Sequence, residues 1–231
     1  MNKAQELIRV LEQKFIKNSD KDRALQQQRY MKSSMPYYGV TMPQVRAITK
    51  GSLKQYAPES NQEYRETLIY IFKNAEYREF WYSGIEYADN FKKFITQENL
   101  DVYIEIVRIT RWWDIVDYVA ANFIGKALIG SENISKISRK LIEDEELWVR
   151  RTGLLLQLKY KEKTDFDLLK ELVLKMAHEK DFFIRKAIGW MLRQYSYVDP
   201  DSVKSFIEEN RDKLSGLSIR EGLRVINKQN L

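Results

Sequence analysis

The sequence has no cysteine, and its only histidine is His178. Without cysteine the chain offers neither a disulfide nor a thiolate nucleophile. One histidine makes a zinc site or a Cys/His catalytic pair implausible, and its setting, KMAHEKD, favours a surface position near the C-terminal end of a helix. We therefore expect no metal and no cofactor.

Proline and glycine are also scarce, with four and nine residues. A β-rich or α/β chain of this length would usually need more turn residues, so an all-α fold is favoured. There is no Gly-rich phosphate loop, which argues against nucleotide hydrolysis. No apolar run reaches the ~18 residues of a membrane span, and MNKAQELIRVLEQKF does not have the pattern of a signal peptide. We expect a protein of the reducing cytoplasm, in a bacterial-type cytosol or nucleoid, with no membrane partner.

Apolar residues follow a helical period along nearly the whole chain. The segments LWVRRTGLLLQLKY, FFIRKAIGWMLRQY and LSIREGLRVI repeat at a spacing of 35 residues, with Arg150, Arg185 and Arg220 in register. Such a period is typical of an α-solenoid, and the pattern fits HEAT-like pairs better than tetratricopeptide repeats. We predict an all-α, curved α-solenoid of about six HEAT-like pairs with a concave basic face, forming a single domain over residues 1–231.

The repeating arginines Arg150, Arg185 and Arg220 have two interpretations. An arginine at a fixed repeat position commonly ties neighbouring helices through a carboxylate or a carbonyl. A row of arginines can also contact DNA phosphates, and the basic neighbours Arg151 and Lys186 favour that alternative. The net charge of +6 is compatible with nucleic acid but is weak evidence by itself.

The stretch RWWDIVDYV, residues 111–119, places two acids beside two tryptophans. On a helical wheel Trp113 and Asp117 lie side by side at the edge of an apolar stripe that begins at Trp112. Asp114 lies in the first turn, where the helix dipole favours an acid. Asp117 is mid-helix, where aspartate is unfavourable, and a salt bridge within the repeat is one explanation. The later repeats have other residues in its register: Thr152, Ala187 and Gly222.

Two further residues depart from their repeat registers. Arg151 occupies a register that elsewhere holds Val116, Lys186 and Glu221, and Trp190 stands where another repeat has a leucine. A tryptophan in AIGWML is also compatible with the core. A carboxylate near indoles and an arginine would stabilise a positive centre, such as an oxocarbenium-like sugar.

Four strings, RITRWWDIVDYV, ELWVRRTGLLLQLKYK, DFFIRKAIGWMLRQY and RYMKSSMPYYGVTMPQVR, closely resemble the AlkD-type DNA glycosylases, HEAT-like-repeat enzymes of alkylation repair. The resemblance covers essentially the whole chain. It implies hydrolysis of the N-glycosidic bond of N3- and N7-alkylated purines in duplex DNA, without the base entering a pocket.

By motif, the resemblance implies that Asp117 stabilises the sugar cation and positions water, while Trp113 and Trp190 hold the sugar. It implies that Arg151 contacts a phosphate and that Tyr30, in RYMK, lies on an N-terminal helix that packs against DNA at the lesion.

The basic registers add Lys186, Arg150 and Arg185 as candidate DNA contacts. We expect a monomer acting on duplex DNA that contains alkylated bases. Two rival classes share this scaffold: a non-catalytic DNA-structure-binding protein, which Asp117 and the RYMK helix disfavour, and a protein-binding solenoid, which the basic registers disfavour.

Overall fold

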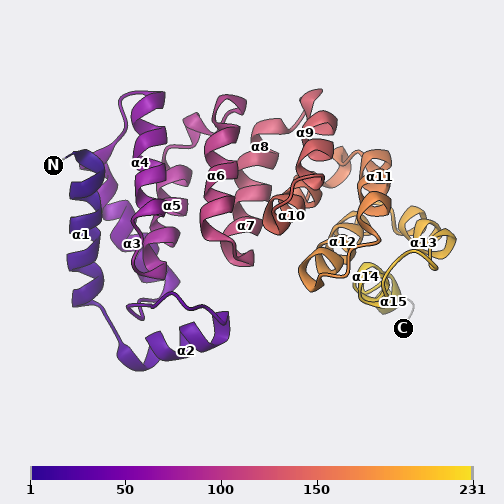
Figure 1. Ribbon diagram of the computed structural model, residues 1–231, viewed down its shortest axis with the longest axis horizontal. Coiled ribbons are helices and arrows are strands. Elements are labelled where there is room, and N and C mark those ends of the chain that lie inside the picture. The colour runs from indigo at the N-terminus through magenta and orange to yellow at the C-terminus, as the bar shows by residue number, and fades with distance from the viewer. Residues whose placement is uncertain (1, 230–231) are drawn as a thin grey trace. The chain divides into compact units, whose positions relative to one another are not determined.

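The computed structural model describes residues 2–229, and every regular element in that range is helical (Figure 1). The chain divides into two compact units, residues 1–110 (unit 1) and residues 111–231 (unit 2). Helices pack in a solenoid-like arrangement within each unit, so the prediction of an all-α solenoid fold is confirmed. The single domain over residues 1–231 stays a prediction. No helix within residues 2–229 is both long and apolar enough to cross a bilayer.

Unit 1 begins with helices whose starts and buried faces follow from local sequence. Its elements are α1 (Lys3–Lys17), α2 (Lys21–Met31), α3 (Met42–Leu53), η1 (Lys54–Tyr56), α4 (Asn61–Lys73), α5 (Arg78–Asn90), η2 (Lys92–Phe94), η3 (Gln97–Asn99) and α6 (Leu100–Thr110). The spacing of Leu7, Leu11 and Phe15 buries one face of α1, as predicted. Thr41 closes a capping box at α3, and Pro43 fits its first turn. α1 contacts α3 and α4, and α5 contacts α3 and α4.

Helix α2 buries little of its own surface, because Met31 is its only buried residue. Hydrogen bonds to the loop that follows it hold it in place. Arg23 donates to the carbonyl oxygen of Gly39 at 2.9 Å, and the Gln27 amide donates to that of Val40 at 3.1 Å. The position of α2 therefore depends on the conformation of this loop.

A buried carboxylate on α5 fixes the same loop. Glu79 accepts the backbone N–H groups of Tyr38, Gly39 and Val40 at 3.0–3.2 Å. Gly39 has a φ of +83°, and a Cβ there would lie 2.0 Å from the carbonyl oxygen of Asp20. Glycine is required at this turn for both reasons.

Unit 2 consists mainly of helical pairs. Its elements are α7 (Trp113–Val119), the π-helical segment η4 (Ala120–Ile124), α8 (Gly125–Leu128), α9 (Asn133–Ile142), α10 (Leu147–Leu155), η5 (Lys161–Lys163), α11 (Phe166–Met176), α12 (Phe182–Tyr195), α13 (Pro200–Glu209), α14 (Gly216–Gly222) and α15 (Ile226–Gln229). The pairs are α9 with α10, α11 with α12, and α13 with α14, and the helices α7, α10, α12 and α14 contact one another in succession (Figure 1). The apolar faces of α10, α11 and α12 supply much of one buried core.

The helical period predicts one helix over 112–129 with a buried stripe from Trp112 to Ala127; residues 113–128 are helical, but the structure corrects both ends of the stripe. Trp112 is the extended N-cap of α7 and only half-buried, so it does not belong to the helical stripe. Its indole packs against Trp148 and Phe183, with ring centroids 5.9 and 5.8 Å away. Further along, the π-helical turn adds a residue and changes the helical phase, so Leu128 is fully buried where Ala127 was expected.

Candidate functional site

Helices α7, α10 and α12 enclose a hollow of about 360 Å³ that opens to solvent. We call it the indole pocket. Its lining residues are Trp113 and Asp117 from α7, Arg151 from α10, and Phe182, Phe183, Lys186, Trp190 and Arg193 from α12. The structure thus brings together five residues singled out in the sequence, although their roles stay predictions: Trp113, Asp117, Arg151, Lys186 and Trp190.

Asp117 and Arg151 form a two-point ion pair in this pocket. Nε of Arg151 donates to Oδ1 of Asp117 at 2.7 Å, and Nη2 donates to Oδ2 at 2.8 Å. Nη1 of Arg151 donates to the backbone carbonyl of Phe183, which connects α10 to the start of α12. The fork geometry fixes the plane of the carboxylate. The Arg151 side chain is 4% exposed and that of Asp117 is 13% exposed.

Burial raises the pKa of Asp117 above its ordinary value, and the hydrogen bonds from Arg151 oppose that shift. The nearby charge of Asp114 adds a small effect in the same direction as burial. Asp114 itself lies in the first turn of α7, as predicted. A desolvated carboxylate interacts strongly with any positive charge that approaches it, since little water screens the pair.

Aromatic rings supply much of the pocket wall. Trp113 begins α7 and lies one helical turn before Asp117, while Trp190 comes from the middle of α12. Both tryptophans are only half-buried. Phe182 is 57% exposed and meets Phe183 edge to face at a centroid distance of 5.4 Å. The half-buried and exposed rings can therefore contact a ligand through their faces.

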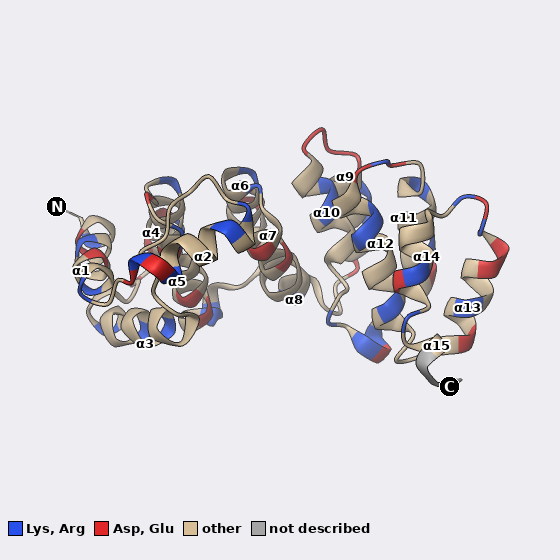
Figure 2. Ribbon diagram, turned by 90° about the horizontal axis from the view of Figure 1, so that it is seen from below, with Lys and Arg blue, Asp and Glu red and all other residues tan. Residues whose placement is uncertain are grey.

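Two further cations line the pocket, and both are held by one acid. Glu221, on α14, accepts from Nζ of Lys186 at 2.5 Å and from Nη1 of Arg193 at 2.6 Å. Figure 2 shows basic residues on α10 and α12 and residues of both signs on α14. Lys186 therefore lies in the pocket, but it already forms an ion pair with the carboxylate of the next repeat, which it shares with Arg193.

Two of the three repeating arginines serve as helix ties. Arg150 donates to two carbonyls of the turn 144–145, at 2.9 and 2.8 Å, and its Nε lies 2.8 Å from a carboxylate oxygen of Glu179. Arg185 donates to the backbone carbonyl of Glu179 at 2.9 Å. Arg220 is exposed on α14. Phosphate contacts by Arg150 and Arg185 stay a prediction.

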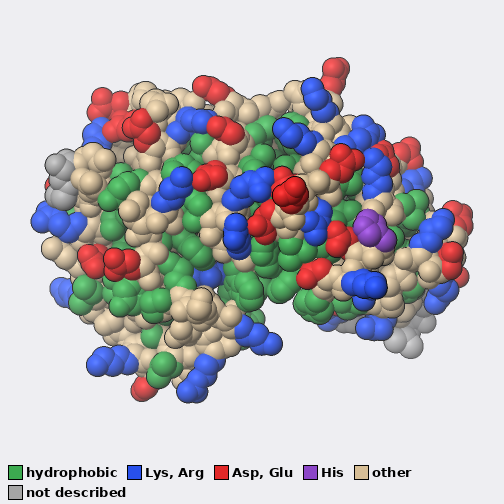
Figure 3. Space-filling view, viewed as in Figure 1, with side chains coloured by type: hydrophobic (Ala, Val, Ile, Leu, Met, Phe, Trp, Pro, Cys, Tyr) green, Lys and Arg blue, Asp and Glu red, His purple; other side chains and the backbone are tan. Residues whose placement is uncertain are grey.

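Tyr30 and His178 lie outside the indole pocket. Tyr30 belongs to α2 of unit 1, where its side chain is 79% exposed. His178 is exposed just beyond the end of α11, as expected, and is the single purple side chain in Figure 3. Within the described residues 2–229, no group of three His, Cys, Asp or Glu side chains is arranged to hold a metal ion.

Sequence reasoning missed four residues around the pocket: Phe182, Phe183, Arg193 and Glu221. A signal for Arg193 was present, because Lys186, Trp190 and Arg193 follow the i, i+4, i+7 spacing of one helical face. Glu221 gave a weaker signal, as an acid in the register of Arg151 and Lys186. Nothing in the sequence indicated that Phe182 would be exposed.

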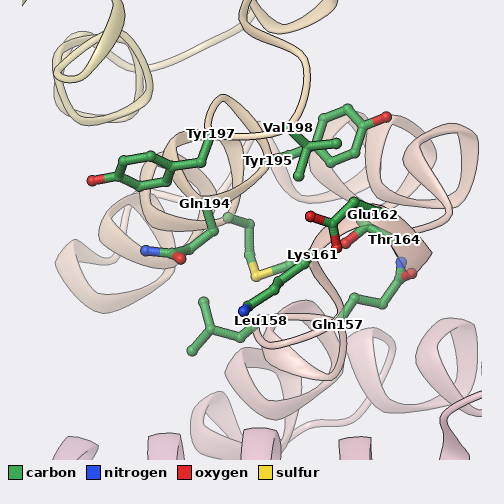
Figure 4. A pocket seen from close by; sticks show the side chains of 10 residues that line it. Gln157, Leu158, Lys161, Glu162, Thr164, Gln194, Tyr195, Tyr197 and Val198 are labelled. Carbon is green, nitrogen blue, oxygen red and sulfur yellow. The ribbon is translucent and has the colours of Figure 1, made fainter.

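A second hollow of about 200 Å³ lies between the turn after α10 and the end of α12 (Figure 4). Its charged residues are the adjacent Lys161 and Glu162, and no tryptophan lines it. It lacks a carboxylate among indoles, so we assign the candidate site to the indole pocket.

Fold and pocket define a class of protein: a helical-repeat protein with a desolvated carboxylate among aromatic faces and cations. The chain belongs to the DNA alkylation repair enzyme family, whose model matches residues 11–226. A solved structure described as a predicted DNA alkylation repair enzyme from Enterococcus faecalis shares 32% identity with a TM-score of 0.78, over 89% of this chain and 95% of that chain. No curated protein matches. The family resemblance is confirmed, and membership supports a role in DNA repair.

Proposed function

We propose that the protein is a DNA glycosylase that hydrolyses the N-glycosidic bond of N3- and N7-alkylated purines in duplex DNA and leaves an abasic site. The observation that carries the proposal is the desolvated carboxylate of Asp117, fixed by Arg151 beside Trp113 and Trp190. Membership in the alkylation repair family supports DNA as the substrate. The proposed species is a monomer that needs no cofactor.

The chemistry requires one carboxylate. An N3- or N7-alkylpurine already carries a positive charge, so the base leaves with the bonding electron pair as a neutral purine and no acid has to protonate it. The positive charge moves to the sugar ring, where Asp117 stabilises it. Water then adds to C1′ and releases one proton. Ordinary glycoside hydrolysis needs a second carboxyl group, because the uncharged glycoside would otherwise have to expel an alkoxide anion, and that carboxyl group protonates the departing oxygen.

The remaining pocket residues bind and orient DNA in this proposal. Trp113 and Trp190 hold the deoxyribose against the carboxylate through ring-face contacts, which favour a cationic sugar. Arg151 uses three of its five N–H donors within the protein, and the remaining two can bind a phosphate. Lys186 provides a second phosphate contact. Tyr30 on α2 contacts the duplex near the lesion.

The first test is to incubate the protein with a duplex that carries 7-methylguanine and to score abasic sites. We expect excision by the wild-type chain. In Asp117→Asn we expect the rate of excision to fall on the order of 10²-fold or more, which is the scale for one electrostatic contact in the transition state. DNA binding by the variant should persist. Undiminished excision by Asp117→Asn would remove the carboxylate from the mechanism.

Two controls make this result interpretable. Asp117→Asn leaves Arg151 buried without its counter-charge, which costs about 3–5 kcal/mol, so a thermal denaturation curve must show that the variant is folded at the assay temperature. Asp114→Asn removes a carboxylate of the same helix that does not line the pocket and should retain excision. Binding by the wild-type chain without any abasic sites would favour a non-catalytic DNA-structure-binding protein.

A further inference from the structure

Glu221 holds two cations that face the indole pocket. Its two carboxylate oxygens lie 2.5 Å from Nζ of Lys186 and 2.6 Å from Nη1 of Arg193. The Glu221 side chain is 13% exposed, whereas that of Lys186 is 36% exposed. Lys186 and Arg193 line the pocket and Glu221 does not. The acid therefore reaches the two cations from a helix outside the pocket wall.

The ion pairs of Glu221 with Lys186 and Arg193 depend on how closely α14 approaches α12. Lys186, Gly189 and Arg193 follow the i, i+3, i+7 spacing of one helical face. A Cβ on Gly189 would lie 2.5 Å from Cβ of Glu221 and 2.8 Å from the backbone oxygen of Ser218, so only glycine leaves room for α14. This close approach places the Glu221 carboxylate between Lys186 and Arg193, which lie one helical turn to either side of Gly189.

All three cations that line the pocket are paired with an acid. Arg151 is bound to Asp117, and Lys186 and Arg193 share Glu221. A DNA phosphate that approaches Lys186 or Arg193 must compete with a carboxylate already in contact with them. Arg193 also lines a neighbouring hollow with the exposed Arg224, which extends the basic surface beyond the pocket.

We propose that Lys186 and Arg193 form a binding site for a backbone phosphodiester of DNA, and that Glu221 is an internal counter-anion that competes with the phosphate for them. The proposal rests on the proposed function only in taking DNA as the ligand. Exchange of the carboxylate for a phosphate limits the affinity for undamaged duplex, because part of the attraction to the phosphate is offset by the ion pairs that are lost.

Competition of this kind has a measurable salt signature. Binding to duplex DNA releases condensed counterions, and the affinity falls with salt by about 0.9 logarithmic units per phosphate neutralised. A carboxylate displaced by the phosphate takes up a cation from solution, which reduces the net number of ions released. Glutamine in place of Glu221 keeps the side-chain shape but removes this uptake.

The experiment measures binding of the full-length chain to an unmodified duplex by fluorescence anisotropy over a series of KCl concentrations. For Glu221→Gln we expect binding that is about fivefold tighter, the scale of one partly exposed ion pair, and a salt slope that is steeper by about one unit. The readout does not involve excision, so it is independent of whether the protein proves to be a glycosylase.

Glu171→Gln is the matched control. Glu171 also binds an arginine and a lysine, Arg139 at 2.7 Å and Lys175 at 3.3 Å, but it does not line the pocket. This variant makes the same change in net charge and should alter binding much less. Equal tightening in both variants would reduce the effect to net charge and overturn the proposal. Weaker binding in Glu221→Gln, restored by Glu221→Asp, would make Glu221 a positioning residue and also overturn it.

A double-mutant cycle locates the effect. If Glu221 acts by occupying Lys186, the gain from Glu221→Gln should shrink in a Lys186→Gln background, because one of the released cations is then absent. If Glu221→Gln increases the DNA affinity by the same factor in the Lys186→Gln background and in an Arg193→Gln background, neither cation is involved. Thermal denaturation of each variant confirms that the compared species are folded.

Discussion

At the scale of the residue, the raised pKa of Asp117 predicts how excision depends on pH. The protonated carboxyl cannot stabilise a sugar cation, so the rate of the chemical step should fall as pH decreases through this pKa. Burial raises the pKa, and Arg151 opposes the shift, so the acid limb should lie above the ~3.9 of an ordinary aspartate. The rate should be flat above the limb, since His178 is exposed and does not line the pocket.

Single-turnover excision of 7-methylguanine across a pH series measures this dependence, with spontaneous loss of the base subtracted from a sample without protein. His178→Gln is the matched control and should reproduce the wild-type profile. A limb that disappears in His178→Gln would assign the titration to the histidine. A rate that rises toward acid would indicate a general acid that the mechanism does not include.

At the scale of the element, α2 should depend on Glu79. This carboxylate accepts three backbone N–H groups of the loop that holds α2, and its side chain is buried. Glu79→Ala leaves those buried donors unpaired, and each costs about 1–3 kcal/mol, so unit 1 should be destabilised by about 3 kcal/mol or more. The loop should loosen first, and α2 with it, because α2 buries only Met31.

Amide hydrogen exchange in α2 is the direct measurement for Glu79→Ala, compared with α11 of unit 2 as an internal reference. Faster exchange throughout α2 with an unchanged α11 is the expected result. Since Tyr30 lies on α2, DNA affinity should fall in the same variant and in Tyr30→Ala. If the amides of α2 are protected equally in Glu79→Ala and in the wild-type chain, the helix is held by other contacts.

At the scale of the whole molecule, the charge of the lesion should decide which substrates are accepted. The indole pocket offers a carboxylate and aromatic faces, and the proposed mechanism uses none of its lining residues to protonate a departing base. Cationic 7-methylguanine should therefore be excised efficiently and neutral uracil poorly, in duplexes matched in sequence. Comparable single-turnover rates for the two lesions would show that charge is not the basis of selection.

Much of the fold could be predicted because local physics determines it. The helical period defines buried faces such as that of α1, and Thr41 with Pro43 defines the start of α3. The 35-residue register correctly grouped α10, α12 and α14. Beyond Asp117 the predicted stripe holds at Val119, Ala120 and Phe123 and fails only at Ala127, because the π-helical turn Ala120–Ile124 changes the phase beyond it.

The sequence by itself determined the residue types of the candidate site and the helical faces that carry them: Asp117 beside Trp113, and Trp190 with Lys186. Only the tertiary structure decided the partners. Arg151, expected as a phosphate contact, is bound to Asp117, and Lys186 forms an ion pair with Glu221. The physical reason is that the helical period sets the direction of a side chain around its own axis. Which charge it meets 34 or 35 residues away depends on how closely the neighbouring helices pack.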